Sequence, residues 1–310
     1  MIASLFNKSR PLNYALISLL LVLFYFLYQT KDLSWMEHYT TVVQKIGSFL
    51  LLLGSLFLVR FISKRNGLTK DNSYTPFLFL LFLILFPSVL INTNIIIANF
   101  FILLSLRRLI SLQSLITPKE KIFDASLWIF VATLFHFWSI LFLILVFVSI
   151  IFHVSRDYRN WIIPFIALFT VLIIFVFAVI VWDKNLLLLV MEKAYISFDF
   201  TYFENVYQNI ALALFSSIAV LFFATQLLAL SNRPLNMQSS YKKILFSFLL
   251  GVGIYVLSSS KNNSFLAFTF FPLAVMGTNF IENIDNKWTR EGVLYSLVAI
   301  SFFIFFAQVL

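Results

Sequence analysis

The chain has 310 residues, of which 61% are hydrophobic and 11% charged, and its mean hydropathy is +0.97. Soluble domains carry about 25% charged residues, so this composition excludes an ordinary soluble protein. The chain has no cysteine, which excludes disulfides and thiolate sites, and only three histidines, which argues against a multi-histidine iron centre. Its net charge of +9 is gathered in alternate connections between apolar segments, as membrane topology requires, so we expect neither a nucleic-acid partner nor a cofactor.

The first third of the sequence predicts four membrane-spanning helices. Leu12–Tyr28 is interpreted as a retained helix, because no small-residue cleavage site follows it. A second helix is expected over Val42–Phe61. The third and fourth, Pro76–Leu90 and Asn94–Leu106, are shorter than the roughly 30 Å hydrocarbon core at about 1.5 Å per residue. We therefore expect flanking residues to extend them or the bilayer to thin around them.

The segment Ile122–Val154 is largely apolar and would be about 50 Å long as one helix, too long for one crossing. Basic connections flank it on both sides and should share one face of the membrane, which requires an even number of crossings. Two short helices that turn near His136–Ser139 satisfy both conditions. Whether the third to sixth spans cross fully or re-enter from one face remains open at this point.

The second half of the chain continues the pattern. Trp161–Trp182 has tryptophan at both ends, as in an interfacial aromatic belt. The segment 183–207 is too polar to span and is predicted to lie at the outer face, with Leu186–Met191 as an amphipathic interfacial helix. The remaining predicted spans are Ile210–Leu230, Ile244–Leu257, Phe265–Ile281 and Val293–Leu310.

These segments predict an all-α, polytopic integral membrane protein of about 11 transmembrane helices, with residues 1–310 as one membrane domain and a cytoplasmic N-terminus. The predicted cytoplasmic segments hold 17 Lys and Arg and 7 Asp and Glu, whereas the outer side holds 5 and 6. The asymmetry follows the positive-inside rule and places the N-terminus on the cytoplasmic side of a membrane, which we expect to be the inner membrane of a bacterium.

Polar residues on the predicted outer side are the candidates for chemistry. Asp32 and Glu37 lie in the first outer loop and could accept a proton from an acceptor hydroxyl. Lys45, His136 and Lys261 are candidate ligands of a lipid phosphate or substrate, since a cation can neutralise a phosphate leaving group. The alternative is that the acids are solvated loop residues, that Lys45 extends to the interface, and that His136 caps a turn. No metal site is expected.

Charged residues on the predicted cytoplasmic side have a simpler interpretation. Asp124 is interpreted as a helix cap that complements the helix dipole. The pairs Arg107–Arg108 and Lys242–Lys243 are assigned to loops that determine topology, with contact to anionic lipid headgroups as the alternative.

Two segments resemble multi-pass glycosyltransferases that use polyprenyl-phosphate sugars, the GT-C class. One is the middle stretch with Arg107–Arg108, residues 119–128 and residues 157–161; the other is 261–272, where a basic residue precedes a proline-containing helix. The resemblance implies a polyprenyl-phosphate-linked sugar as substrate. The adjacent acidic pair that is usual in that class is absent, since four residues separate Asp32 from Glu37. The opening residues 1–14 are similar to a membrane-protein family of Bacteroidota, especially flavobacteria, that brings no established activity.

Three functions remain open from the sequence. The first is a glycosyltransferase-like protein acting on lipid-linked sugars at the outer face. The second is a noncatalytic membrane subunit of an envelope assembly or secretion complex, with envelope proteins as partners. The third is a transporter or lipid flippase, which usually places polar groups near the midplane; here Asn99 and Gln226 are among the few such residues. Membrane lipids are partners in every case.

Overall fold

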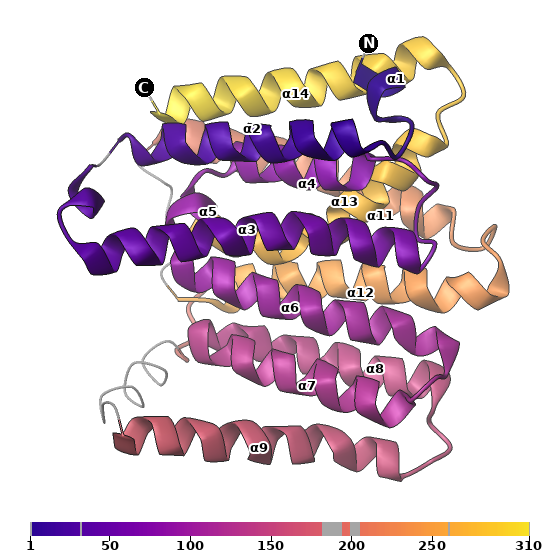
Figure 1. The fold of residues 1–310 in the computed structure, drawn as a ribbon. Helices are drawn as coiled ribbons and strands as arrows, with labels where there is room; N and C mark the ends of the chain where they lie inside the picture. Colours follow the sequence, from indigo (N-terminus) through magenta and orange to yellow (C-terminus); the bar gives the residue numbers. More distant parts are fainter. Residues whose placement is uncertain (1, 32, 182–193, 199–204, 260, 310) are drawn as a thin grey trace.

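The computed structural model describes residues 2–31, 33–181, 194–198, 205–259 and 261–309, and these are almost entirely helical. The long helices lie roughly parallel to one another in a single bundle (Figure 1). In chain order the helices are α1 Ile2–Phe6, α2 Pro11–Gln29, η1 Ser34–Met36, α3 Tyr39–Arg65, α4 Tyr74–Leu85, α5 Ser88–Ile91, α6 Thr93–Ser111, η2 Leu112–Ser114, α7 Pro118–Phe135, η3 Phe137–Phe142, α8 Leu143–His153, α9 Arg159–Val181, α11 Val206–Leu228, α12 Leu235–Leu257, η4 Asn263–Leu266, α13 Ala267–Glu282 and α14 Lys287–Val309.

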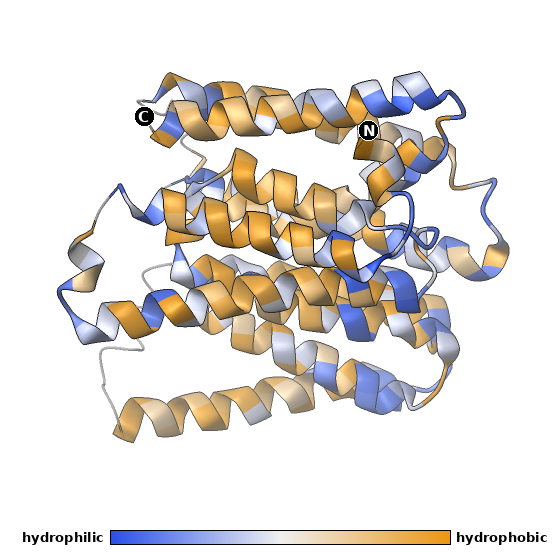
Figure 2. Cartoon of the chain, turned by 45° about the horizontal axis from the view of Figure 1, so that its top comes forward, coloured by the Kyte–Doolittle hydropathy of each residue, from blue (hydrophilic) through white to orange (hydrophobic). Residues whose placement is uncertain are grey.

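Eight helical segments within the described part of the chain are long and apolar enough to cross a membrane: α2, α3, α6 with η2, α9, α11, α12, η4 with α13, and α14. Figure 2 shows apolar residues along the middle of the helices, with polar residues toward their ends and in the connections. The fold is therefore all-α with eight candidate membrane spans.

The helix connections gather at two ends of the bundle. We call one the first-loop end, where α2 ends and α3 begins, and the other the N-terminal end, where residues 2–10 lie (Figure 1). Consecutive long helices alternate in direction between these ends.

Burial divides the helices into a central and a peripheral group. Every residue of α4 is buried, and α4 packs along α13, which together with η4 forms a span that is 94% buried over its apolar part. By contrast, the corresponding part of α9 is only 22% buried, and α9 packs on α7 and α8 at the edge of the bundle. In a bilayer the exposed apolar side of α9 suits contact with lipid.

The turn at His136 confirms the prediction of two short helices. α7 ends at Phe135, and His136 adopts an extended conformation with φ −140° and ψ 107°. The chain then returns through η3 and α8. The expected lengthening of the fourth span is also confirmed, because α6 runs from Thr93 to Ser111.

The third span differs from its prediction. α4 ends at Leu85 instead of continuing to Leu90, and the short helix α5 begins only at Ser88. The cause is Pro87, since proline disfavours helical conformation in the residue before it, and Phe86 has φ −121° and ψ 73°.

Five charged residues at the N-terminal end are placed wrongly by the sequence analysis. Arg107 and Arg108 lie within α6, which runs from Thr93 to Ser111, and not in a loop. α12 begins at Leu235, well before the predicted Ile244, so Lys242 and Lys243 lie on a helix and not in a loop. Asp124 is not a cap, because α7 already begins at Pro118. Its carboxylate instead forms an ion pair with Arg108, with an N–O distance of 2.7 Å.

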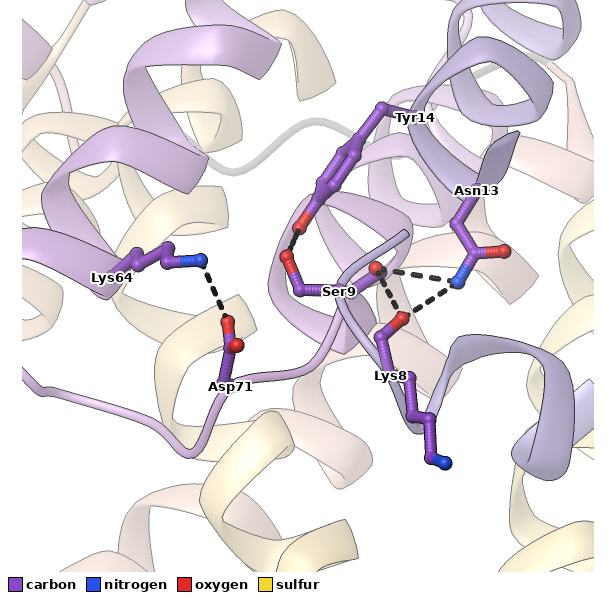
Figure 3. A network of polar contacts seen from close by, with 7 residues as sticks. Lys8, Ser9, Asn13, Tyr14, Lys64 and Asp71 are labelled. Atoms are coloured by element: carbon purple, nitrogen blue, oxygen red, sulfur yellow. Dashed lines mark hydrogen bonds and ion pairs between the residues drawn. The ribbon is translucent and has the colours of Figure 1, made fainter. Parts of the chain in front are cut away.

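The N-terminal segment is fixed to the bundle by side chains of α2 and of the α3–α4 connection (Figure 3). Asn13 Nδ2 donates to the carbonyl of Lys8 at 2.8 Å, and the hydroxyls of Ser9 and Tyr14 are 2.7 Å apart. Nearby, Lys64 and Asp71 form an ion pair at 3.0 Å across the end of α3. The bonds made by Asn13 and Tyr14 hold residues 8–9, which follow α1, against the start of α2, and the Lys64–Asp71 pair closes the end of α3.

Candidate functional site

A small pocket of about 170 Å³ lies at the first-loop end, between the α5–α6 junction, the His136 turn and the end of α12. Its lining combines amide, imidazole, indole and hydroxyl groups with aromatic rings. The lining residues are Asn92, Asn94, Ile95, Phe135, His136, Trp138, Ser258, Ser259 and Phe265. Small, mixed polar and aromatic pockets of this kind suit a ligand that carries hydroxyl groups.

His136 is the central side chain of this pocket. Its Nε2 lies 3.2 Å from Ser258 Oγ, and its ring packs against Phe265 and Phe268 at centroid distances of 4.8 and 5.6 Å. Ser258 Oγ also lies 2.6 Å from the carbonyl of Ile254, to which its single proton is donated. Ser258 Oγ therefore accepts from His136, which requires the imidazole proton to be on Nε2.

Lys261 reaches the same serine from the α12–η4 connection. Its ammonium donates to the carbonyls of Ser197, Val256 and Ser258 at 2.5, 2.9 and 3.3 Å. Ser258 thus joins two residues that the sequence predicted independently, His136 through its hydroxyl and Lys261 through its main-chain carbonyl. An ammonium held by carbonyls keeps its positive charge close to the rim of the pocket.

The rim also contains polar atoms that have capacity for a ligand. Asn92 caps α6 by accepting from the N–H of Ile95 at 3.4 Å, and its amide donates to Ser264 Oγ at 3.2 Å. Trp138 Nε1 is buried and has no hydrogen-bond partner within the described residues. An indole N–H that is buried without a partner costs free energy.

The first loop is fixed next to this pocket through the end of α2. Gln29 Nε2 donates to the carbonyl of Leu90 at 3.3 Å, two residues before the pocket residue Asn92. Trp35 Nε1 donates back to the carbonyl of Gln29 at 3.4 Å. The base of the first loop and the rim of the pocket are therefore parts of one contact network.

The five sequence-predicted site residues are not all brought together. His136 and Lys261 converge on Ser258, whereas Glu37 is exposed between η1 and α3. Lys45 is half-buried within α3, and its carbonyl accepts from the Tyr25 hydroxyl at 2.8 Å. Asp32 lies outside the described residues, as do most of the predicted 183–207 segment and its Leu186–Met191 helix. In the described part of the chain, no three His, Asp or Glu residues gather to hold a metal ion.

Ser258, Asn92 and Trp138 were missed by the sequence analysis. Serine, asparagine and tryptophan are common at helix ends of membrane proteins, so their residue type gave no signal. Two positional clues existed: Ser258 and Ser259 precede Lys261, and Asn92 falls in the predicted turn between the third and fourth spans. Neither clue indicates that these segments meet.

Comparison with known proteins gives a result only at the level of the family. No curated protein and no solved structure matches the chain. One family model, described as a family of unknown function (DUF6427), matches residues 5–310. Because that match extends over nearly the whole sequence, the chain belongs to the DUF6427 family.

Proposed function

We propose that this protein binds the sugar headgroup of a lipid-linked sugar in the first-loop pocket and acts on it in the manner of a glycosyltransferase. The observation that carries the proposal is the convergence of His136 and Lys261 on Ser258 beside Asn92 and Trp138. Amide and hydroxyl groups next to aromatic rings match the hydroxyl-rich faces of a sugar. The pocket has room for about one monosaccharide ring, and its lipid tail would extend along the exposed helices.

We further propose eleven membrane crossings in a bacterial cytoplasmic membrane, with the first-loop end outside the cytoplasm. The eight long helices supply eight crossings, and α4 with α5, α7, and η3 with α8 supply three more. Alternating helix directions and the basic residues of the N-terminal end support this orientation. We include in this proposal the resemblance of the sequence to GT-C enzymes and to membrane proteins of Bacteroidota.

The proposed transfer uses one acid and one cation. A carboxylate of the first loop, Asp32 or Glu37, takes the proton of an acceptor hydroxyl. At the same time the oxygen of that hydroxyl forms a bond to the anomeric carbon of the sugar. The bond from that carbon to the phosphate oxygen breaks, and the polyprenyl phosphate leaves with the electron pair. Lys261 or Lys45 neutralises the leaving phosphate. The contact of Gln29 with Leu90 supports this arrangement, because it keeps the first loop beside the pocket.

A second candidate is a noncatalytic membrane subunit of an envelope complex. The observation that favours it is that Glu37 is exposed in the first loop and is not among the residues that line the pocket. In that case the pocket binds a lipid-linked sugar, or another hydroxyl-rich headgroup, without turning it over.

The deciding experiment compares deletion strains complemented with wild type, Asp32→Ala/Glu37→Ala, or His136→Ala, at equal membrane abundance. Mass spectrometry measures lipid-linked sugars in cells, and native mass spectrometry measures binding of a polyprenyl-phosphate sugar to each purified protein. Accumulation of an intermediate in the acid double variant supports the transferase. Loss of binding in His136→Ala with full complementation by the double variant supports the noncatalytic subunit. Absence of binding to the wild type overturns both.

A further inference from the structure

A basic cavity lies at the N-terminal end of the bundle, opposite the first-loop pocket. It has a volume of about 300 Å³ and is formed by the ends of α3 and α6, by η2 and by the start of α7. Four of its lining residues are cationic: Arg65, Arg107, Arg108 and Lys121. The other lining residues are Phe61, Asn66, Ser111, Gln113, Ser114 and Ile116.

The positive charge of this cavity is only partly balanced. Among the described residues, the ion pair of Arg108 with Asp124 at 2.7 Å is the only salt bridge that involves one of its cations. Lys121 is 8% exposed, yet its ammonium is held by neutral groups, the carbonyl of Ser111 and the hydroxyl of Ser114, each at 2.8 Å. Burying an ammonium without a nearby carboxylate costs free energy, and a bound anion would lower this cost by balancing the positive charge.

Aromatic packing holds two of the guanidinium groups in place. Arg107 and Arg65 lie over the Phe61 ring, with distances of 4.7 and 5.4 Å from the guanidinium carbon to the ring centroid. The planar guanidinium forks match two oxygens of a phosphate group, and packing on a ring reduces the entropy lost when they bind. Like charges held together in this way indicate a preformed anion site.

A second buried ammonium lies directly behind the cavity. Lys243 on α12 is fully buried and donates to the carbonyl of Leu109 at 2.7 Å, two residues beyond Arg107. Its ammonium also lies 3.2 Å from His153 Nε2. On the same helix, Ser240 Oγ donates to Gln113 Oε1 at 2.6 Å, which connects α12 to the cavity wall. Lys243 therefore ties α12 to α6 behind the cavity without lining it.

Topology alone does not require this arrangement. The positive-inside rule concerns the number of Lys and Arg residues near the helix ends, and exposed residues such as Lys242 and Lys287 meet it fully. It does not require a concave site, a buried lysine or guanidiniums packed on a ring. The apolar residues Phe61 and Ile116 in the same lining suit the start of an acyl or prenyl chain.

We infer that the cavity formed by Arg65, Arg107, Arg108 and Lys121 is a binding site for a phosphate group, either on a lipid headgroup or free. The site is independent of the proposed function, because it lies at the other end of the bundle and shares no residue with the first-loop pocket.

The test measures phosphate binding in two forms by the purified full-length protein in nonionic detergent. Native mass spectrometry titrates dioleoyl phosphatidic acid, and a thermal-shift titration uses sodium phosphate against sodium chloride at equal ionic strength. The cavity variant is Arg107→Gln/Lys121→Gln. The control, Lys242→Gln/Lys287→Gln, removes the same charge from exposed positions at the same end. Arg65→Gln serves as a second cavity variant that is safe for folding, because Arg65 is exposed.

We expect both cavity variants to weaken binding, the double variant by roughly tenfold or more, and the control to bind as the wild type does. Lipid binding that free phosphate cannot displace identifies a headgroup site, whereas binding of free phosphate alone identifies a soluble phosphate ligand. Either result supports the inference. Equal weakening in the control and cavity variants, or absence of binding to the wild type in both forms, overturns it.

Discussion

His136 Nε2 donates to Ser258 Oγ at 3.2 Å, although 122 positions separate the two residues in the chain. This hydrogen bond joins the α7–η3 turn to the end of α12 and fixes the imidazole at the wall of the first-loop pocket. Ser258 also donates to its own helix, so one hydroxyl connects helix end, pocket and turn.

Replacing Ser258 with Ala should therefore lower the free energy of unfolding by more than the loss of a hydrogen bond from a serine to its own helix does. Ser149→Ala is the matched control, because Ser149 is also buried and donates to the carbonyl four residues earlier, at 2.7 Å. We expect Ser258→Ala to be less stable than Ser149→Ala by about 1 kcal/mol, since only the former removes the hydrogen bond between His136 and Ser258. Denaturant unfolding in detergent micelles measures the difference. Equal stability would show that the His136–Ser258 contact contributes nothing to folding.

Gly251 is required by the close approach of α12 to α13. A Cβ atom at this position would lie 2.8 Å from Thr269 Cγ2 and 3.1 Å from backbone atoms of Phe268. We expect Gly251→Ala to destabilise the protein by about 1–3 kcal/mol, because the backbone of Phe268 cannot move away easily. Gly47→Ala has nothing within 4 Å of the new methyl group and should be neutral or slightly stabilising. Thermal unfolding of both variants provides the comparison; similar melting temperatures would contradict the packing argument.

Gln226 and Asn279 form a buried side-chain pair between α11 and α13. Asn279 Nδ2 donates to Gln226 Oε1 at 3.0 Å, while Gln226 Nε2 and Asn279 Oδ1 have no partner among the described residues. Such pairs in membrane helices contribute about 0.6 kcal/mol. We expect each single substitution to Leu to be destabilising and the double Leu variant to recover part of that loss. A double-mutant cycle on unfolding free energies measures the coupling, and strict additivity would mean that the pair does not interact.

Asp157 should make the start of α9 sensitive to acid. Its Oδ1 accepts the N–H of Arg159 at 3.0 Å, and Lys119 forms an ion pair with it at 3.2 Å. The hydrogen bond from Arg159, followed by that from Lys119, lowers the pKa of Asp157 below its ordinary value of 3.8. The carboxylate therefore stabilises the fold above that value, and the contribution disappears as the pH falls through the lowered pKa.

The expected result is a melting-temperature difference between wild type and Asp157→Asn that is present at neutral pH and vanishes at strongly acidic pH. Thermal melts across this range measure it. Glu120→Gln is the control, since it removes a nearby exposed carboxylate that forms no ion pair with the residues that the structure describes. A difference that persists unchanged in acid would exclude the carboxylate as its source.

Features that depend on length and charge were predictable from the sequence. The turn at His136 follows from an apolar segment too long for one crossing and from basic residues on both sides of it, and the structure confirms it. The start of α12 was predicted too late, because hydropathy treats Lys242 and Lys243 as a boundary. The structure buries Lys243 within the helix by giving its ammonium the carbonyl of Leu109 as an acceptor.

The sites were less accessible to sequence reasoning. His136 and Lys261 were selected for residue type, but nothing in the sequence indicates that both contact Ser258, which requires knowledge of tertiary packing. The basic cavity was hidden for a different reason. In the sequence, Arg107 and Arg108 indicate only the orientation of the protein in the membrane. The folded structure is needed to show that Phe61 lies against Arg107 and that Lys121 lines the same cavity.

The complete burial of α4 has a consequence for the biogenesis of the protein. Its main partner α13 is among the last segments to be translated, so α4 leaves the ribosome long before the helix that encloses it exists. At about 5–20 residues per second, this interval lasts roughly ten to forty seconds. Meanwhile the Thr75 hydroxyl, which pairs with Thr278 at 3.0 Å in the finished protein, must be tolerated by lipid or shielded by the insertion machinery. Chains that stop before α13 therefore lack the centre of the bundle, and we expect quality-control proteases to remove them.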